Sequence, residues 1–403
     1  MSGWGSTRVT EEKFPEIKSL TRNFQSLNID MGLMKGLTQS LFNVVLHVGK
    51  NVRCLKLSVE ELENMPEFYL MLKEMPLLEK LDIVRYNIDK PVTLTDNKLS
   101  EICLKNLKVL ELGQGMWFIL KEITVPHIKT VVFDSYHLNH PGLIDPYALT
   151  LTNFLNRSDT LKEITIAGTP LKAIFLSDLP RNFKFHLKKL SFELYDEKVC
   201  ENFEKFLESQ AMSLEEIDLN SNLDRIIIAV FNTTRVKKLT LYSDRMPREK
   251  DFYDQLIPSQ SIKDLIIKQS LTDEMLKGVL EKIPNLKNFK HICGFPSSDE
   301  MSKMLAFMAA HNPKLESLDM FGFGDDQDYI NTKFDNLKSL CLKDPNSPQT
   351  LIKFIINNPS ITSVNIAKMP KDYFEEFMTS LRNRPGFTIN GTETRSYSIK
   401  RTC

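Results

Sequence analysis

The chain has 403 residues with 52 basic and 52 acidic side chains, so its formal charge is zero and no overall field draws it to nucleic acid or anionic lipid. The longest apolar run, Ile226 to Phe231, is far too short to span a bilayer, and the first thirty residues contain no signal-peptide core. Six cysteines are scattered singly, which predicts reduced thiols in a protein of the cytoplasm or the nucleus. The composition therefore predicts no membrane partner and no nucleic acid partner.

The first residues of the chain give little structural signal. Residues 1–20 are polar and predict a tail or a partial cap, because a helical pattern only starts to emerge near Phe14. Between Leu33 and Val48 apolar side chains recur at spacings of three and four, which predicts an amphipathic helix. Gly49 follows this helix, and we expect a strand over residues 54–57.

One six-residue window, apolar-x-x-apolar-x-apolar, recurs along the whole sequence. Its last three positions have a period of two, which is typical of a short strand with one buried face. We find fourteen windows with a mean spacing of about 26 residues, and they start at Phe24, Val52, Leu78, Leu107, Ile128, Leu161, Leu187, Leu214, Val236, Ile262, Leu286, Leu315, Leu337 and Ile361.

Helix signals precede many of these windows. Capping residues, prolines at the first helical position and apolar spacing of three and four indicate where the helices start and stop. The predicted helices are Phe68 to Met75, Asp145 to Arg157, Asp196 to Gln210, Ser297 to His311 and Ser347 to Asn357.

A single strand and helix cannot enclose a core, so neighbouring repeats must stack. The sequence therefore predicts an α/β solenoid of about fourteen irregular strand-helix repeats, shaped as a horseshoe with a concave parallel sheet and helices outside. We expect one repeat domain over residues 21–386, and a cap or short strand with a tail over residues 387–403, where the periodicity is lost.

Very regular repeats carry an asparagine after each strand, and its side chain binds the loop backbone of the next repeat. Only Asn222 fits this position here. We therefore expect such an asparagine ladder to be mostly absent, so that backbone groups in the loops find other partners.

Residues between the apolar strand positions should point onto the concave face. The candidate partner-binding residues on that face are Asp82, Glu111, Glu163, Glu193, Glu216, Asp218, Asn220, Thr240, Tyr242 and Lys268. Of these, Glu163, Glu193, Glu216 and Asp218 are expected to form an acidic patch that could receive a basic segment. The alternative is an ordinary solvated sheet face.

Other conspicuous residues favour structural roles. Trp117 and Phe118 could anchor a partner, but core packing is the favoured interpretation. The basic stretch 235–250 is interrupted by acids and indicates a solvated face. Residues 322–328 lack the EF-hand register, and His291 with Cys293 has no second zinc-ligand pair. The sequence predicts no metal site, no cofactor and no catalytic residue, since nucleotide-binding and nucleophile motifs are missing.

The repeats resemble the leucine-rich repeat family over roughly residues 22–367. Their irregular spacing, and the lead-in TRNFQSLNIDMGLMKGLTQSLFNVVLHVGKNVRCLKLS, are similar to the repeat region of insect-like F-box proteins, although the F-box itself is absent. This resemblance implies a monomeric scaffold that binds a protein on the concave face, and substrate recognition for a ubiquitin ligase with the Skp adaptor and a cullin as partners.

Two alternatives remain open at this point. The first is an adaptor or assembly platform unrelated to ubiquitin. The second is a GTPase-activating protein of the Ran type, in which Arg85 at a strand end would act on the nucleotide.

Overall fold

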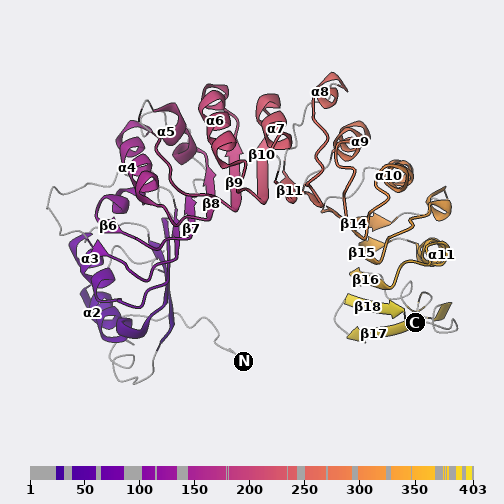
Figure 1. Cartoon of the computed structure of the whole chain (residues 1–403). Helices are drawn as coiled ribbons and strands as arrows, with labels where there is room; N and C mark the ends of the chain where they lie inside the picture. The colour runs from indigo at the N-terminus through magenta and orange to yellow at the C-terminus, as the bar shows by residue number, and fades with distance from the viewer. Residues whose placement is uncertain are drawn as a thin grey trace. The chain divides into compact units, whose positions relative to one another are not determined.

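In the computed structural model the chain forms two compact units, residues 1–190 and 191–403. The boundary falls inside strand β9 (Lys189–Leu194; Figure 1). The structure describes residues 24–30, 39–59, 65–85, 102–113, 116–133, 144–177, 179, 181–233, 235–242, 250–268, 271–292, 298–323, 328–345, 347–367, 375, 377, 379–380, 387–392 and 396–401. The predicted tail over residues 1–20, the first part of the helix predicted from Leu33, and the Ser297 cap lie outside these residues.

The first unit is built on parallel strands that neighbour one another in the order of the chain. These strands are β1 (Ser26–Asp30), β2 (Cys54–Val59), β3 (Lys80–Arg85), β5 (Val109–Leu112), β7 (Thr130–Phe133) and β8 (Glu163–Ala167). A second, two-stranded sheet pairs β4 (Ile102–Cys103) with β6 (Ile123–Thr124) in parallel.

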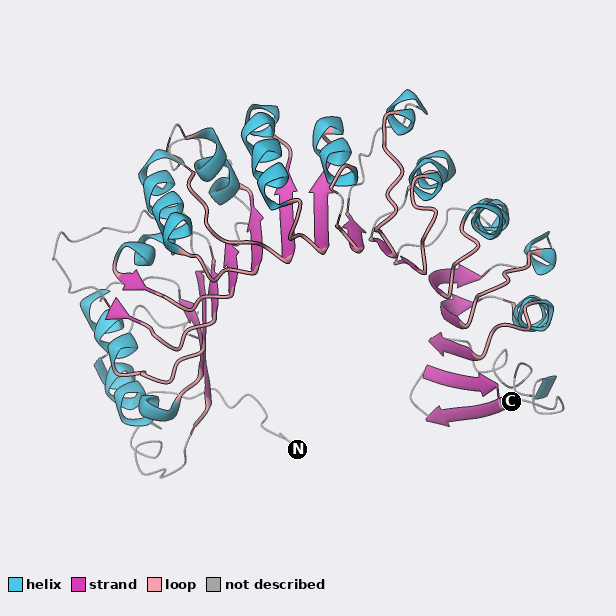
Figure 2. Cartoon of the chain, in the orientation of Figure 1, coloured by secondary structure: helices cyan, strands magenta, loops and turns pink. Residues whose placement is uncertain are grey.

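Helices or 3-10 turns separate most successive strands of the main sheet in the first unit; between β3 and β5 the described residues contain only the short strand β4. They are α2 (Gln39–Val48), η2 (Gly49–Asn51), α3 (Met65–Lys73), η3 (Trp117–Lys121), α4 (Ile144–Arg157) and α5 (Thr169–Leu176). In Figure 2 these helices lie along one side of the strands, which leaves the other side of the sheet open.

The second unit repeats the same plan after β9 (Lys189–Leu194). Its parallel strands are β10 (Glu216–Ser221), β11 (Lys238–Leu241), β12 (Asp264–Ile267), β13 (Asn288–His291), β14 (Ser317–Phe323), β15 (Ser339–Pro345) and β16 (Ser363–Ala367). Its helices and turns are η5 (Glu197–Val199), α6 (Cys200–Gln210), α7 (Asp224–Phe231), α8 (Lys250–Asp254), α9 (Asp273–Glu281), α10 (Ser298–His311), η6 (Asp328–Asn331) and α11 (Pro348–Asn357).

The last two strands break the parallel pattern. Strand β18 (Ser396–Arg401) pairs antiparallel with β16, and β17 (Phe387–Thr392) pairs antiparallel with β18. The stretch over residues 387–403, expected to contain a cap or a short strand, thus supplies a β-hairpin that occupies the edge of β16.

All fourteen windows read from the sequence coincide with a strand, and each strand begins at the third residue of its window. The fourth residues, such as Ile217, Leu239 and Leu265, stand side by side in the register of the second unit and are fully buried. The buried face recurs at the same place in every window after the first, where Leu27 and Ile29 of the end strand β1 are half-buried. The predicted α/β solenoid of the leucine-rich repeat type is therefore confirmed.

Most predicted helix ends are also confirmed, with small differences in the caps. Asp196 accepts the backbone N–H of Lys198 at 3.1 Å and starts the turn that leads into α6. Helix α11 begins at Pro348 as expected, but the hydroxyl of Ser347 lies 2.9 Å from that of Thr350 and caps no backbone N–H. No helix within the described residues is long and apolar enough to cross a lipid bilayer.

Side-chain amides connect neighbouring repeats by hydrogen bonds in the turns before the strands. They lie in the turns that enter the strands, one residue before a window, and donate to a backbone carbonyl of the preceding repeat. The pairs are Asn106 to Pro76 at 2.8 Å, Asn285 to Gln260 at 3.0 Å and Asn336 to Pro313 at 2.8 Å. By contrast, Asn222 buries its Oδ1 without a hydrogen-bond partner.

Two further asparagines in these turns, Asn312 and Asn358, are fully buried. Asn312 donates to the carbonyl of Ile283 at 2.9 Å. The Oδ1 of Asn358 accepts the N–H of Phe334 at 2.7 Å, and its Nδ2 donates to Thr332 at 3.0 Å. In place of an asparagine ladder after the strands, these amides before the strands satisfy backbone groups of the preceding repeat.

Candidate protein-binding face

The open sheet face of each unit consists of rows, because parallel strands in register place equivalent window positions side by side. In the first unit the third residues form the row Lys80, Val109, Thr130 and Glu163. The fifth residues form a second row of Lys56, Asp82, Glu111, Val132 and Thr165. These rows mix charged and apolar side chains on one rigid surface.

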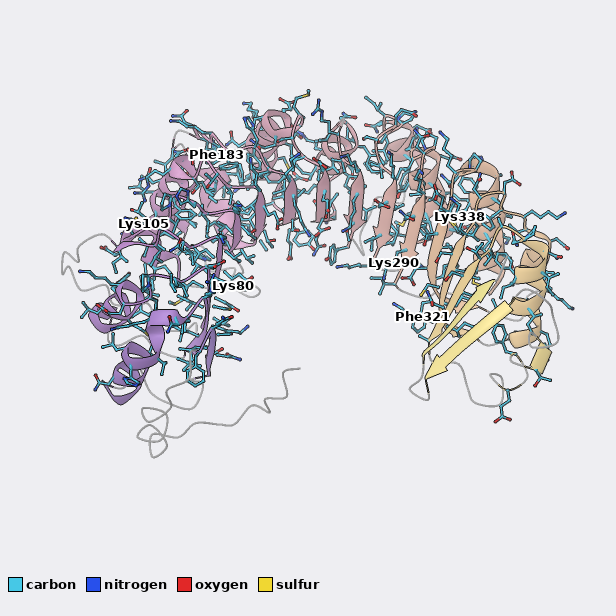
Figure 3. All side chains as sticks on the ribbon, turned by 60° about the horizontal axis from the view of Figure 1, so that its bottom comes forward. Lys80, Lys105, Phe183, Lys290, Phe321 and Lys338 are labelled. Carbon is cyan, nitrogen blue, oxygen red and sulfur yellow. The ribbon has the colours of Figure 1, made fainter. Side chains whose placement is uncertain are left out.

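Both acids predicted near the start of this face are held by lysines of the preceding strand. Lys56 contacts Asp82 at 2.9 Å, and Lys80 contacts Glu111 at 2.6 Å. The hydrogen bond to Glu111 raises the pKa of Lys80, which stays charged. The Asp82 side chain is only 9% exposed, so this carboxylate offers little surface to a partner. Figure 3 labels Lys80, the cation paired with Glu111.

Three of the four acids of the expected acidic patch lie in the second unit, and two of them on β10. Glu216 contacts Lys238 at 3.2 Å, and Asp218 accepts a hydrogen bond from the Ser191 hydroxyl at 2.8 Å. Glu193 lies on β9, whereas Glu163 belongs to the first unit. The patch stays a prediction, and part of its charge is already balanced by neighbouring strands.

The remaining candidates of the second unit are Asn220 on β10, Thr240 on β11, and Tyr242 and Lys268 directly after β11 and β12. The side-chain oxygen of Asn220 accepts from the Tyr195 hydroxyl at 2.7 Å. The ammonium of Lys268 lies 4.2 Å from the centre of the Tyr242 ring and also donates to its hydroxyl, which is a cation–π contact reinforced by a hydrogen bond. Thr240 stands between Asp218 and Ile266 in the register and is 2% exposed, so it offers little to a partner.

The open face continues beyond the candidates that the sequence analysis named. Strands β13 to β15 place Lys290, Asp319 and Cys341 in one row, and Lys290 contacts Asp319 at 2.7 Å. Phe321 is half-buried and pairs in register with Lys343 (Figure 3 labels Lys290 and Phe321). Alignment of the windows would have found these residues. Lys290, Asp319 and Cys341 are the fifth residues of their windows, as Asp218 is, and Phe321 directly follows its window, as Asn220 does.

Several of the residues for which a structural role was favoured lie in the core or at strand ends. Trp117 and Phe118 are 2% and 1% exposed in η3, so their predicted core packing is confirmed. His291 is buried at the end of β13, with its ring stacked on Phe289 at a centroid distance of 6.3 Å. Cys293 and residues 324–327 lie outside the described residues. The part of the chain that the structure describes contains no group of three metal-ligating side chains.

The cysteines that the structure describes are free thiols at positions 54, 103, 200 and 341. Burial raises the pKa of the Cys200 and Cys341 thiols, and the nearby carboxylate of Asp319 adds to the effect at Cys341. Because a raised pKa keeps the thiol protonated near neutral pH, both side chains are poor nucleophiles.

No protein-family model matches this sequence, and no curated protein matches it. Among solved structures the chain is similar to one from the yeast Rad7 and Elc1 complex, with 14% identity and a TM-score of 0.39 over 77% of this chain and 73% of that chain. It is also similar to one from the TLR13–ssRNA13 complex, with 13% identity and a TM-score of 0.40 over 87% of this chain and 56% of that chain. The assignment of the fold therefore rests on this chain's own windows and strand register.

Proposed function

We propose that this chain is a protein-binding scaffold that acts by binding and not by catalysis, and that the partner lies on the open sheet face. The observation that carries this proposal is the composition of the rows on that face. Charged side chains stand beside half-buried apolar ones, such as Val132 in the first unit and Ile266 and Phe321 in the second, and none of the described helices covers them. A partner with matching charges could bury these apolar positions.

The rigidity of this surface favours recognition of a folded partner or an extended segment. Each row is fixed by the sheet hydrogen bonds, and cross-strand contacts such as Lys290 with Asp319 hold the side chains in place. Preorganised side chains lose little conformational entropy on binding, which supports affinity without a large interface.

At a finer level, we propose that the partner is a substrate of a ubiquitin ligase and that the chain works with the Skp adaptor and a cullin. The support is the similarity of residues 22–367 and the lead-in sequence to the repeat region of F-box proteins. A general adaptor is the other outcome of the test.

Affinity purification of the full chain from its native cells, with quantitative detection of co-purifying proteins, tests both levels. Recovery of the Skp adaptor and cullin in stoichiometric amounts supports the ligase role. Recovery of another protein without them supports a plain scaffold, and recovery of no protein above background contradicts the proposal.

A charge swap shows whether that partner uses the open face. The double variant Lys290→Asp with Asp319→Lys keeps an ion pair within the sheet but reverses its direction, so we expect the partner to be lost while the fold is kept. The matched control reverses Glu201 and Lys205 on α6, which form an exposed pair at 2.7 Å on a helix and should leave the partner bound.

A further inference from the structure

The second residue of each window precedes its strand and points away from the core. Its carbonyl accepts the N–H groups of both the second and the third residue of the next window, as Lys129 does for Lys162 at 2.8 Å and Glu163 at 2.9 Å. This bulge-like pattern turns both side chains outward. The second residues therefore form a row of their own along the edge where the strands begin.

In the first unit this edge carries four consecutive lysines, Lys108, Lys129, Lys162 and Lys188, here called the lysine row. Backbone hydrogen bonds of 2.7–2.8 Å from each lysine to the one before it show that they stand on adjacent strands. Adjacent strands are about 4.8 Å apart, so the row brings like charges together, an arrangement that disfavours folding.

In some other windows the second residue is a glutamate, whose carboxylate neutralises the cations at the second positions of the windows before and after it. Glu79 binds both Arg53 and Lys108, the latter at 2.8 Å. In the second unit Glu316 binds Lys287 at 2.6 Å and Lys338 at 3.1 Å. Hydrogen bonds from the flanking cations lower the pKa of both glutamates. A carboxylate at this edge is thus held by two cations at once.

Lys129 and Lys162 lack such a carboxylate among the residues that the structure describes, and both are exposed. The nearest acid in sequence, Glu163, takes a contact of 3.5 Å from the Thr130 hydroxyl. Lys105 and Lys184, in the turns before the first and last windows of the row, are also exposed. A chain with no net charge therefore has a local excess of cations here.

We propose that the lysine row binds an extended acidic segment of a partner protein, with a carboxylate seated between Lys129 and Lys162 as Glu316 sits between its two lysines. Carboxylate is favoured over phosphate because the fold already uses carboxylates at the equivalent positions of this edge. Single-stranded nucleic acid is the alternative occupant, because the exposed imidazoles of His127 and His186 stand in the turns before two windows of the row and could stack on bases. This edge lies outside the rows of the open face, so the proposal does not depend on what binds there.

The test uses the full chain and a fluorescent peptide of alternating glutamate and serine, about ten residues long so that it spans the row's four strands. We expect the change in anisotropy to report binding that weakens as salt is added. The variant Lys129→Glu places an acid between two lysines and should lower the affinity about tenfold or more. The midpoint of thermal unfolding of this variant should stay unchanged or rise, because a glutamate between two lysines recreates the arrangement around Glu316.

The matched control is Lys263→Glu, which makes the same charge change at the second residue of a window in the second unit. Its neighbours Lys237 and Lys287 already contact Glu215 and Glu316, so peptide binding should change less than about twofold. Equal losses of peptide affinity in both variants would overturn the proposal. An unchanged anisotropy with the wild-type chain would overturn it as well. Tighter binding of duplex DNA of equal charge would show that the row selects phosphate instead.

Discussion

Asn358 offers the sharpest test of how neighbouring repeats are joined. In the variant Asn358→Ala, the N–H of Phe334 and the carbonyl of Thr332 lose the side chain that satisfies them at 2.7 Å and 3.0 Å. The carbonyl of Phe354 is less affected, because it also accepts the backbone N–H of residue 358 at 3.1 Å. Two buried groups left unpaired cost about 1–3 kcal/mol each, so we expect the free energy of unfolding to fall by about 2–6 kcal/mol.

Urea unfolding followed by circular dichroism measures this loss. The matched control is Asn336→Ala, which removes a single hydrogen bond of an exposed side chain and should cost about 0.5–1 kcal/mol. If both variants lost the same free energy within about 0.5 kcal/mol, the buried amide would not be the connection that we infer. The variant Asn358→Asp separates the two roles, because it keeps an acceptor for Phe334 and removes the donor to Thr332.

Three other changes test the register, the edge charges and the helix packing. Ile217→Asp should abolish the cooperative thermal transition, because it buries a charge among neighbouring repeats, while the outward Asp218→Ala should leave it nearly unchanged; equal effects would refute the strand register. Glu316→Gln should make stability depend less on pH in the acid range. The pKa of Glu316 in the folded chain is lowered from 4.5, so its contribution to the free energy of unfolding is present above pH 4.5 and is lost as pH falls through the lowered value. Urea midpoints measured at several pH values would show the difference. Gly278→Ala should destabilise by about 1–3 kcal/mol although alanine favours helices, because the added Cβ would lie 2.5 Å from the Tyr253 ring; a stabilised variant in thermal melts would contradict this packing.

The strands were predictable because their signal is local. Each window contains the complete period-two pattern, so the first residue of all fourteen parallel strands of the main sheet could be placed without knowledge of their neighbours; β4, β6, β17 and β18 have no window. The rows of the open face follow from the same alignment. Lys56 and Asp82, for example, are the fifth residues of successive windows, and their ion pair follows from that equivalence.

The connections between repeats were not predictable in the same way. Asn312 and Asn358 both stand three residues before a window. Other repeats have residues such as Met75 or Ser158 at that position, so the spacing does not mark a buried donor and acceptor. The burial of Thr240 likewise depends on the longer side chains beside it and not on its own window. Sequence patterns thus specify which face of a strand is buried, while satisfaction of polar groups depends on contacts between repeats.

The antiparallel hairpin of β17 and β18 has a consequence for self-association. A parallel array of repeats ends in a strand whose free N–H and C=O groups could template another chain, either a second copy or an unfolding neighbour. Strand β18 pairs with β16 from Ser363 to Ala367 in the opposite direction, so the next position is no longer a continuation of the parallel repeat pattern. The hairpin thereby covers the edge of β16 and leaves the antiparallel strand β17 outermost, so the last parallel repeat offers no free strand to a further parallel repeat.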